Sequence, residues 1–160
     1  MKAKELMIGD LVRVSKDVCI EKGAIVRVHA IDGDNNFPEK GLKGCVTCVR
    51  INDPDRMSGG VWAEYLEPIP LTAEILEKNG FEELMNESEV SAARFGRKPE
   101  PTGVWQYGFG QFDSVAYVFE QSFLRIKFME GYTADIANIK YVHELQHALR
   151  LCGIEKEIIL

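Results

Sequence analysis

The chain has 160 residues, of which 46% are hydrophobic and 28% charged, a composition typical of an ordinary soluble globular protein. Its 19 Lys and Arg against 25 Asp and Glu give a formal net charge of −6, so no overall positive field exists to collect nucleic acid or an anionic membrane. The longest apolar stretches, such as residues 24–31, fall far short of the ~18 residues that a membrane span needs.

The first residues contain no apolar stretch of the kind that a secretory signal requires, so we expect a cytoplasmic protein. Four cysteines lie among apolar residues of strand-like or helical character. We expect them to be buried thiols in a reducing compartment rather than a disulfide framework. They are Cys19, Cys45, Cys48 and Cys152.

Residues 9–70 consist of short alternating segments separated by turn-forming residues, which is the pattern of a small all-β unit. Four or five short strands in about 60 residues favour a barrel similar to the Src-homology-3 (SH3) fold. The fold class expected for the whole chain is α+β. The expected strands are 11–15, 24–31, 44–51 and 61–66, with loops at 32–38 and 52–60.

The segment Pro68-Ile69-Pro70 marks the expected boundary between two domains, 1–70 and 71–160. Proline fixes its own backbone and lacks an N–H donor, so neither a strand nor a helix continues easily through it. Thr72 is a good cap for a helix at 73–78.

The second domain is expected to be an antiparallel meander packed by a C-terminal helix. Three alternating segments supply the meander, and a long apolar stripe supplies the helix. In chain order, we expect a helical or irregular stretch at 81–94, a loop at 96–103, strands at 104–109, 114–119 and 123–129, a helix at 139–151 and an edge strand at 158–160.

The sequence His143-Glu144-Leu145-Gln146-His147 is an H-E-x-x-H motif on the expected C-terminal helix. Histidines four residues apart share a helix face and can both bind zinc, while the glutamate acts as general base for metal-bound water. Such a site would make the chain a zinc-dependent hydrolase with Glu144 as its catalytic residue and His143 and His147 as metal ligands.

Two features of the surrounding sequence weigh against zinc. A catalytic zinc normally has three protein ligands, yet the metzincin spacing places Gly153 where the third histidine belongs. At ~100° per residue, His143 and His147 fall opposite the apolar stripe of the helix, beside Arg150. We therefore expect a pair of histidines that points away from the apolar stripe and is either solvated or interface-facing, with no metal and no cofactor.

The spacing of Cys45-Val46-Thr47-Cys48 matches half of a zinc site or a redox pair. The neighbouring β-branched residues favour a strand, in which residues i and i+3 point to opposite faces. The chain has no second C-x-x-C, so we expect two core cysteines rather than a ligand pair.

Asp32-Gly33-Asp34-Asn35-Asn36 imitates the start of a calcium-binding loop. Phe37 stands where the loop glycine belongs, and Lys43 stands where the bidentate glutamate belongs. The segment is therefore expected to be a plain polar loop.

Trp105, Tyr107 and Phe109 alternate on one face of an expected strand. Aromatic side chains on an open sheet can stack nucleobases, although the same residues can equally pack beneath the C-terminal helix. We expect packing.

Three segments stand out: Met7-Ile8-Gly9-Asp10, residues 66–81 around the boundary, and residues 141–147 near the end. Together they resemble a group of short proteins of unassigned function from gut Bacteroides and their phages or mobile elements. Some similar tails carry Gln or Asn in place of Glu144 and His147. The resemblance leaves residues 82–135 unmatched and implies no catalytic residue.

The sequence favours a non-enzymatic accessory binding or assembly factor that acts through protein–protein contacts, with another protein or a second copy as its partner. A membrane partner is not expected. The alternatives are the zinc-dependent hydrolase and a nucleic-acid-binding adaptor that uses the barrel. Metal content tests the first alternative, and salt-sensitive retention on DNA or RNA tests the second.

Overall fold

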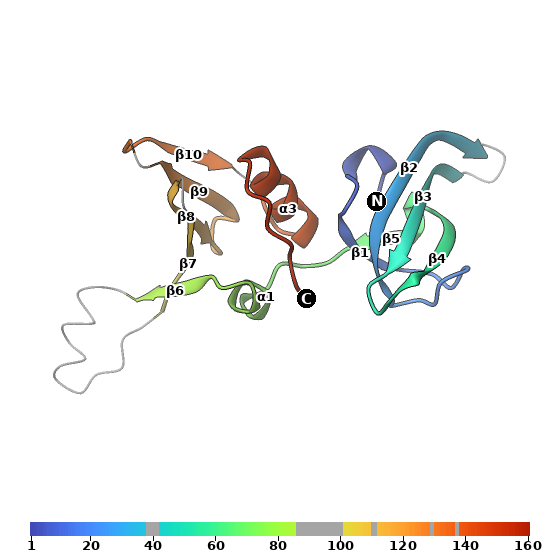
Figure 1. The fold of residues 1–160 in the computed structure, drawn as a ribbon, viewed down its shortest axis with the longest axis horizontal. Helices are drawn as coiled ribbons and strands as arrows, with labels where there is room; N and C mark the ends of the chain where they lie inside the picture. The colour runs from blue at the N-terminus through green and yellow to red at the C-terminus, as the bar shows by residue number, and fades with distance from the viewer. Residues whose placement is uncertain (38–41, 86–100, 110–111, 129, 137) are drawn as a thin grey trace. The chain divides into compact units, whose positions relative to one another are not determined.

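A computed structural model describes residues 1–37, 42–85, 101–109, 112–128, 130–136 and 138–160 (Figure 1). The chain folds into a mixed α and β structure with two five-stranded antiparallel sheets, which confirms the expected α+β class. Its contacts divide it into two units. Unit 1 is Met1–Pro70 with Tyr141–Leu151, and unit 2 is Leu71–Lys140 with Cys152–Leu160.

The sheet of unit 1 has the strand order β4-β3-β2-β1-β5, so β4 and β5 are its edges and the sheet is not closed. Strands β2 and β3 are long and bent (Figure 1). The elements of this unit are η1 (Ala3–Glu5), β1 (Leu11–Val14), β2 (Ile25–Phe37), β3 (Leu42–Arg50), β4 (Asp53–Trp62), the 3-10 helix η3 (Ala63–Tyr65), β5 (Leu66–Pro68) and α3 (Val142–Leu151).

Two expected loops of unit 1 are strands. Residues 32–37 continue β2, where Asp32 is in register with Cys45 and Phe37 with Leu42, so the calcium-like segment is part of a hairpin. Residues 53–60 belong to β4. Polar, turn-forming residues led to both errors. Antiparallel pairing with β3 places these residues in strands, although their side chains are typical of turns.

The core of unit 1 is formed by the inward faces of its strands, including Val12, Val26 and Val28, all fully buried. Alternation along the strands brings these β-branched side chains to one face. They pack in one cluster with Leu6, Val14, Ile20, Val46, Cys48, Val61, Ala63 and Leu66.

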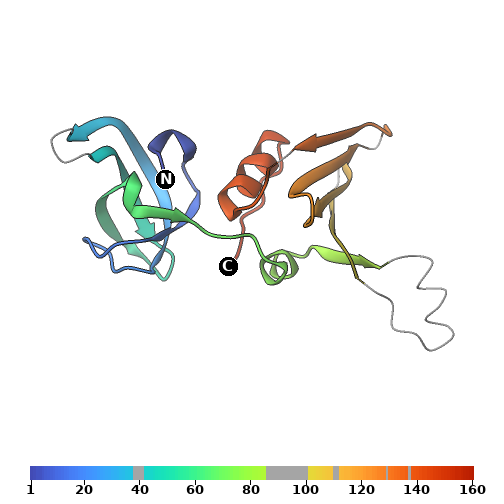
Figure 2. The ribbon, with the colours of Figure 1, turned by 180° about the vertical axis from the view of Figure 1, so that it is seen from behind.

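The sheet of unit 2 has the order β10-β9-β8-β7-β6 (Figure 2). Helix α1 lies where it was expected, and the Oγ1 of its cap Thr72 accepts a hydrogen bond from the N–H of Ile75 at 3.4 Å. The elements are α1 (Ala73–Lys78), β6 (Glu82–Met85), β7 (Pro101–Phe109), β8 (Phe112–Val118), β9 (Phe123–Phe128) and β10 (Thr133–Ile136).

Three expectations for unit 2 are wrong. Residues 82–85 form a strand rather than a helical or irregular stretch, and residues 101–103 belong to β7 rather than to a loop. Residues 158–160 form no strand. The rest of the expected stretches, residues 86–94 and 96–100, lies outside the described residues.

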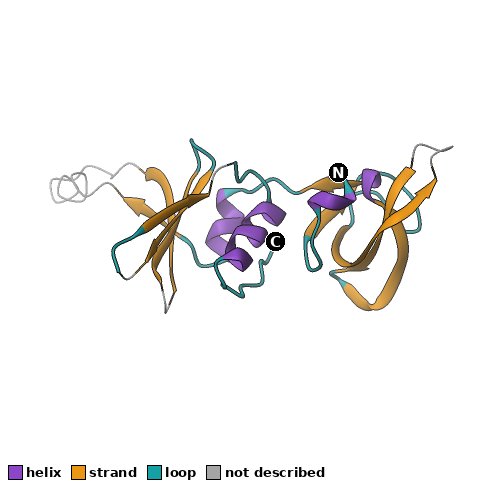
Figure 3. Cartoon of the chain, turned by 90° about the horizontal axis from the view of Figure 1, so that it is seen from above, coloured by secondary structure: helices purple, strands orange, loops and turns teal. Residues whose placement is uncertain are grey.

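One face of the unit 2 sheet is apolar and buried. Trp105 and Tyr117 pack edge-on against Phe119, with ring centroids 6.4 and 5.0 Å apart. The hydroxyl of Tyr117 donates to the carbonyl of Ile139 at 2.6 Å, so its polar end is satisfied inside the unit. Strands and helices of each unit are distinguished by colour in Figure 3.

Helix α3 is grouped by its contacts with unit 1, although the sequence analysis assigned it to the domain 71–160. The chain therefore leaves unit 2 after Lys140, contributes α3 to unit 1, and returns to unit 2 at Cys152. In the described part of the chain, no helix has the length and apolar character required to cross a membrane.

Candidate functional site

The H-E-x-x-H motif occupies the first turns of α3, and its glutamate has a structural partner. The Oε2 of Glu144 accepts a hydrogen bond from the N–H of Tyr141 at 3.1 Å. An acidic side chain three residues after the cap that binds the cap N–H is half of a capping box. Glu144 thus satisfies a backbone donor at the start of the helix.

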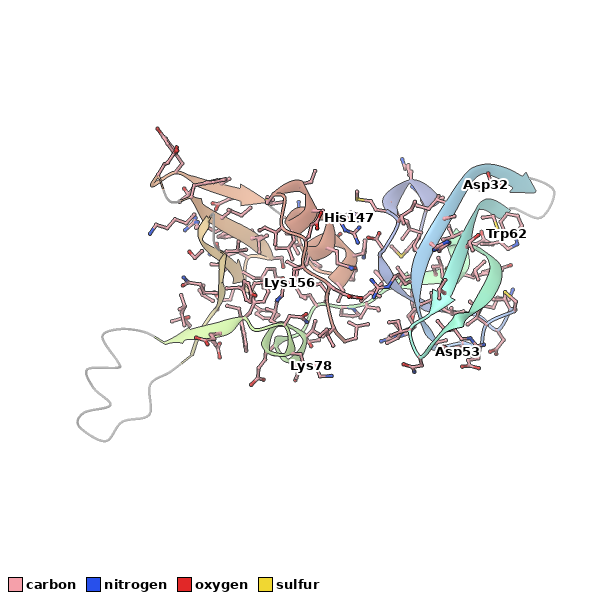
Figure 4. The ribbon with its side chains drawn as sticks, in the orientation of Figure 1. Asp32, Asp53, Trp62, Lys78, His147 and Lys156 are labelled. Atoms are coloured by element: carbon pink, nitrogen blue, oxygen red, sulfur yellow. The ribbon has the colours of Figure 1, made fainter. Side chains whose placement is uncertain are left out.

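Asp10 is the centre of a polar cluster in unit 1 and is fully buried. Its Oδ2 accepts from the N–H of Met7 at 2.7 Å and from Nε2 of His147 at 2.8 Å. Its Oδ1 accepts from Nη1 of Arg150 at 3.3 Å. His147, labelled in Figure 4, and Arg150 come from one face of α3 because they lie three residues apart. The buried carboxylate of Asp10 thus accepts hydrogen bonds from the main chain of its own turn and from two basic side chains.

Gly9 makes the close approach of Arg150 sterically allowed. Its φ of +91° lies in the left-handed region, and its N–H donates to the carbonyl of Val28 at 2.7 Å. A Cβ at this position would stand 2.6 Å from Nη2 of Arg150. The guanidinium therefore lies where any side chain at residue 9 would be.

Gln146 joins α3 to the same turn through its amide. Its Oε1 accepts from the N–H of Leu11 at 3.0 Å, and its Nε2 donates to the carbonyl of Gly9 at 3.3 Å. The side chain is buried and pairs with both a main-chain donor and a main-chain acceptor. It therefore links the start of β1 to the helix by hydrogen bonds.

The solvated alternative for His143 and His147 is wrong, since this face of α3 packs against the Gly9–Asp10 turn. Only 5% of His143 is exposed, and the side chain of His147 is 22% exposed. The ring of His143 stacks on Tyr141, with centroids 5.9 Å apart, and packs edge-on against His147. The polar face of α3 is covered because the Gly9–Asp10 turn offers it polar partners.

Burial also changes the protonation of His143. Its Nδ1 is buried and has no hydrogen-bond partner among the described residues. Desolvation lowers the pKa of His143, and the opposing effect of the Asp10 and Glu144 carboxylates is smaller. The neutral imidazole is therefore the form that fits the folded unit.

The geometry of the motif does not present a set of metal ligands. Nε2 of His147, the ring nitrogen farthest from the backbone, is bonded to Asp10. Glu144 is bound to the start of the helix. Within the described ranges, no three His, Cys, Asp or Glu side chains are grouped so that they could hold a metal ion. The cluster is instead a clasp between α3 and the residue 7–11 turn.

Cys45 and Cys48 lie on opposite faces of β3, as the strand pattern predicts. Cys48 is in the core, where burial raises its pKa to about 12, while Cys45 is half-buried. Burial also raises the pKa of Cys45, and the nearby Asp32 carboxylate adds to this effect. The expectation that all four cysteines are buried is wrong, since Cys19 is exposed.

A second feature of note is a groove beside the edge strand of unit 2. It has a volume of about 500 Å³ and is lined by Gly80, Glu82, Leu84, Gln106, Tyr107 and Gly108. Nothing lies within 4 Å of the position that a Cβ at Gly108 would take, whereas a Cβ at Gly80 would stand 3.1 Å from Cε2 of Tyr107. The Leu84 side chain is 40% exposed at its rim.

The aromatic face expected on the sequence 105–109 is used for packing. Trp105 is 8% exposed, and Tyr107 contacts Phe81 with ring centroids 5.4 Å apart. Nζ of Lys156 lies 4.1 Å from the centroid of the Tyr107 ring. Neither ring offers a free face for a nucleobase. The side chain of Phe109 lies outside the described residues.

Sequence reasoning missed Asp10 and Gln146, the two residues that explain why the polar face of α3 is buried. Asp10 is 137 residues from His147 in the sequence, and the residues around a short Gly-Asp turn do not indicate such a distant partner. Comparisons of this chain with protein families, with curated proteins and with solved structures find no match.

Proposed function

We propose that the protein is a non-enzymatic binding or assembly factor that acts through protein–protein contacts. The observation that carries the proposal is the groove beside β6, which stands at the edge of the unit 2 sheet. Strand addition to a sheet edge is a common way for one protein to bind an extended segment of another.

The chemistry of this groove fits an extended partner segment with an apolar side chain. Main-chain groups on the outer side of an edge strand are available for pairing. Leu84 supplies apolar surface, and Gly108, where nothing lies within 4 Å of a Cβ position, supplies room. Glu82, exposed in the same wall, favours a basic or polar neighbour on the partner.

A photo-crosslinking amino acid at position 84 of the full chain tests the proposal in cells. We expect a discrete protein adduct there. The matched control is the same probe at Ile51, which is 39% exposed in unit 1. Equal adducts from both positions, or none from position 84, would contradict the proposal. An adduct that nuclease digestion removes would indicate the nucleic-acid adaptor instead.

Elemental analysis tests the zinc hydrolase. Because Glu144 and His147 are occupied by Tyr141 and Asp10, we expect no stoichiometric zinc after purification without added metal. One zinc per chain that is lost in His143→Ala would restore the hydrolase hypothesis.

We also infer that unit 1 has the SH3-like barrel architecture. In its support, the strand order β4-β3-β2-β1-β5 and the 3-10 turn η3 before the last strand are typical of such barrels. We further propose membership of the Bacteroides and phage group and residence in the cytoplasm. The two end segments that carry that resemblance, 7–10 and 141–147, hydrogen-bond to each other.

A further inference from the structure

The segment Cys152–Leu160 lies in unit 2 as an extended strip without helix or strand. It runs beside α1, whose last residue Lys78 is labelled with Lys156 of the strip in Figure 4. We call this strip the tail, and the residues of α1 and β7 that bind it, namely Lys78, Asn79 and Tyr107, the tail seat.

The side-chain amide of Asn79 binds the main chain of the tail. Its Oδ1 accepts from the N–H of Ile159 at 2.9 Å, and its Nδ2 donates to the carbonyl of Ile159 at 2.8 Å. The same Nδ2 donates to the carbonyl of Ile75 at 2.7 Å, which fixes the amide on α1. Only 4% of Asn79 is exposed. One side chain thus performs the paired bonding that a neighbouring strand would otherwise supply.

Further contacts fix the position of the tail along the seat. Nζ of Lys78 donates to the main-chain oxygen of Leu160 at 3.0 Å, and Lys156 stands over the Tyr107 ring. The tail buries Ile154 and Ile158, at 6% and 2% exposure, whereas the intervening residues 155–157 are not buried and Ile159 is 60% exposed. Two apolar anchors followed by main-chain hydrogen bonds at Ile159 and Leu160 are the features of a bound peptide.

The tail is joined to the rest of the chain through Gly153, whose φ is +71°. The residues before it, in α3, are grouped with unit 1 rather than with unit 2. The tail is therefore joined to α3 by a single turn at glycine, which has the backbone freedom of a hinge.

We propose that the tail seat also accepts the tail of a second copy of this chain, giving a tail-exchanged dimer. The occupant seen in the seat is this chain's own sequence, so a second copy supplies a tail of matching chemistry. Every hydrogen bond and both buried isoleucines are the same whether the tail comes from its own chain or from another. Exchange then requires only the opening of the Gly153 hinge. This proposal is tested at Asn79 and Ile158, neither of which lines the groove at Leu84, although Tyr107 borders both sites.

Two complementary full-length variants test the exchange. Asn79→Ala has a damaged seat and an intact tail, while Ile158→Asp has an intact seat and a damaged tail. Each alone is expected to remain a monomer of 18.0 kDa in light scattering after size exclusion. An equal mixture is expected to form a one-to-one complex of twice that mass, because the intact tail can enter the intact seat.

The control is the double variant, Asn79→Ala with Ile158→Asp. Both its seat and its tail are damaged, so we expect no complex between it and either single variant. If both single variants retain the circular dichroism of the wild type and their mixture stays monomeric, the proposal is overturned. A failure of the Leu84 crosslink leaves this result unaffected, which keeps the two proposals separate.

If Ile158→Asp does not fold, an experiment with wild-type chains alone tests the tail exchange. Unlabelled and nitrogen-15-labelled wild-type chains are mixed at high concentration and analysed by native mass spectrometry. Mixed dimers that an excess of a peptide with the 152–160 sequence disperses support the proposal. An absence of mixed dimers, or mixed dimers that the peptide leaves intact, contradicts it.

Discussion

Each unit binds one of two consecutive segments of the chain, α3 in unit 1 and the tail in unit 2, but the two segments are held by different chemistry. Unit 1 receives α3 through a fully buried carboxylate, Asp10, bound by the basic side chains of His147 and Arg150. Unit 2 receives the tail through the neutral amide of Asn79, which binds main-chain groups of Ile159. The first clasp depends on the identity of particular side chains, whereas the second depends chiefly on backbone geometry.

This difference has a consequence for specificity. A buried carboxylate without its basic partners is costly, so the α3 clasp accepts few alternative sequences. An amide that binds a peptide backbone accepts any extended segment whose apolar anchors fit. The charged clasp is therefore suited to a permanent contact, and the amide clasp is suited to exchange.

The largest expected effect is on the apolar side of α3. Leu145 is fully buried, so Leu145→Ala should lower the free energy of unfolding by about 2–5 kcal/mol through lost contacts and a cavity. Leu151→Ala in the same helix is the control, since Leu151 is 80% exposed and its loss should cost less than about 0.5 kcal/mol. Urea denaturation of both variants measures the difference; equal losses would place the buried face of α3 elsewhere.

The charged clasp is tested by Asp10→Ala. The change leaves the N–H of Met7 and two basic side chains without their acceptor, so unfolding should become easier by about 2–3 kcal/mol. Glu67→Ala is the matched control, because Glu67 pairs with Arg13 at 3.6 Å on the surface and should contribute less than about 1 kcal/mol. If the two substitutions cost the same, the Asp10 cluster contributes no more than a surface ion pair.

The steric part of the same clasp is tested by Gly9→Ala. Both Gly9 and Gly23 have positive φ, at +91° and +88°, so alanine is strained at either position, at a cost of about 1 kcal/mol. At residue 9 the new Cβ must also displace the Arg150 guanidinium, while nothing lies within 4 Å of a Cβ at residue 23. Gly9→Ala should therefore have the lower melting temperature of the two. Equal melting temperatures would show that Arg150 moves aside without loss.

The last expected difference concerns pH. The pKa of His143 is lower in the folded unit than in the unfolded chain, so below about pH 6.5 the unfolded chain binds the proton more readily. The contribution of neutral His143 to the free energy of unfolding is therefore fully present above that pH. It is lost as the pH falls toward the lowered pKa of His143 in the folded unit.

Hydrogen exchange measured between about pH 7 and pH 5 checks this, because lost stability speeds the exchange of unit 1 amides beyond the intrinsic rate. His143→Gln should reduce the loss, and His29→Gln, at an exposed position, should not. If unit 2 amides respond to His143→Gln as strongly as unit 1 amides, the contrast between the two clasps is wrong.

Much of the local structure follows from the sequence. Alternating β-branched residues predicted β1, the first half of β2, most of β3, and the positions of Cys45 and Cys48 on opposite faces. Thr72 predicted the start of α1, and the apolar stripe predicted the buried Leu145 and Leu149. These predictions succeed because periodicity is a property of neighbouring residues.

The sequence could not decide what covers a polar face or completes a sheet. Helical periodicity separates His143 and His147 from the apolar stripe, but it cannot show that His147 binds Asp10, which is 137 residues away in the sequence. Residues 158–160 look like a strand, yet Asn79 supplies their pairing from a helix end. Local patterns record which faces are apolar. Residues distant in sequence are brought together only when the whole chain folds. Only the tertiary structure therefore shows that His147 of the H-E-x-x-H motif binds Asp10.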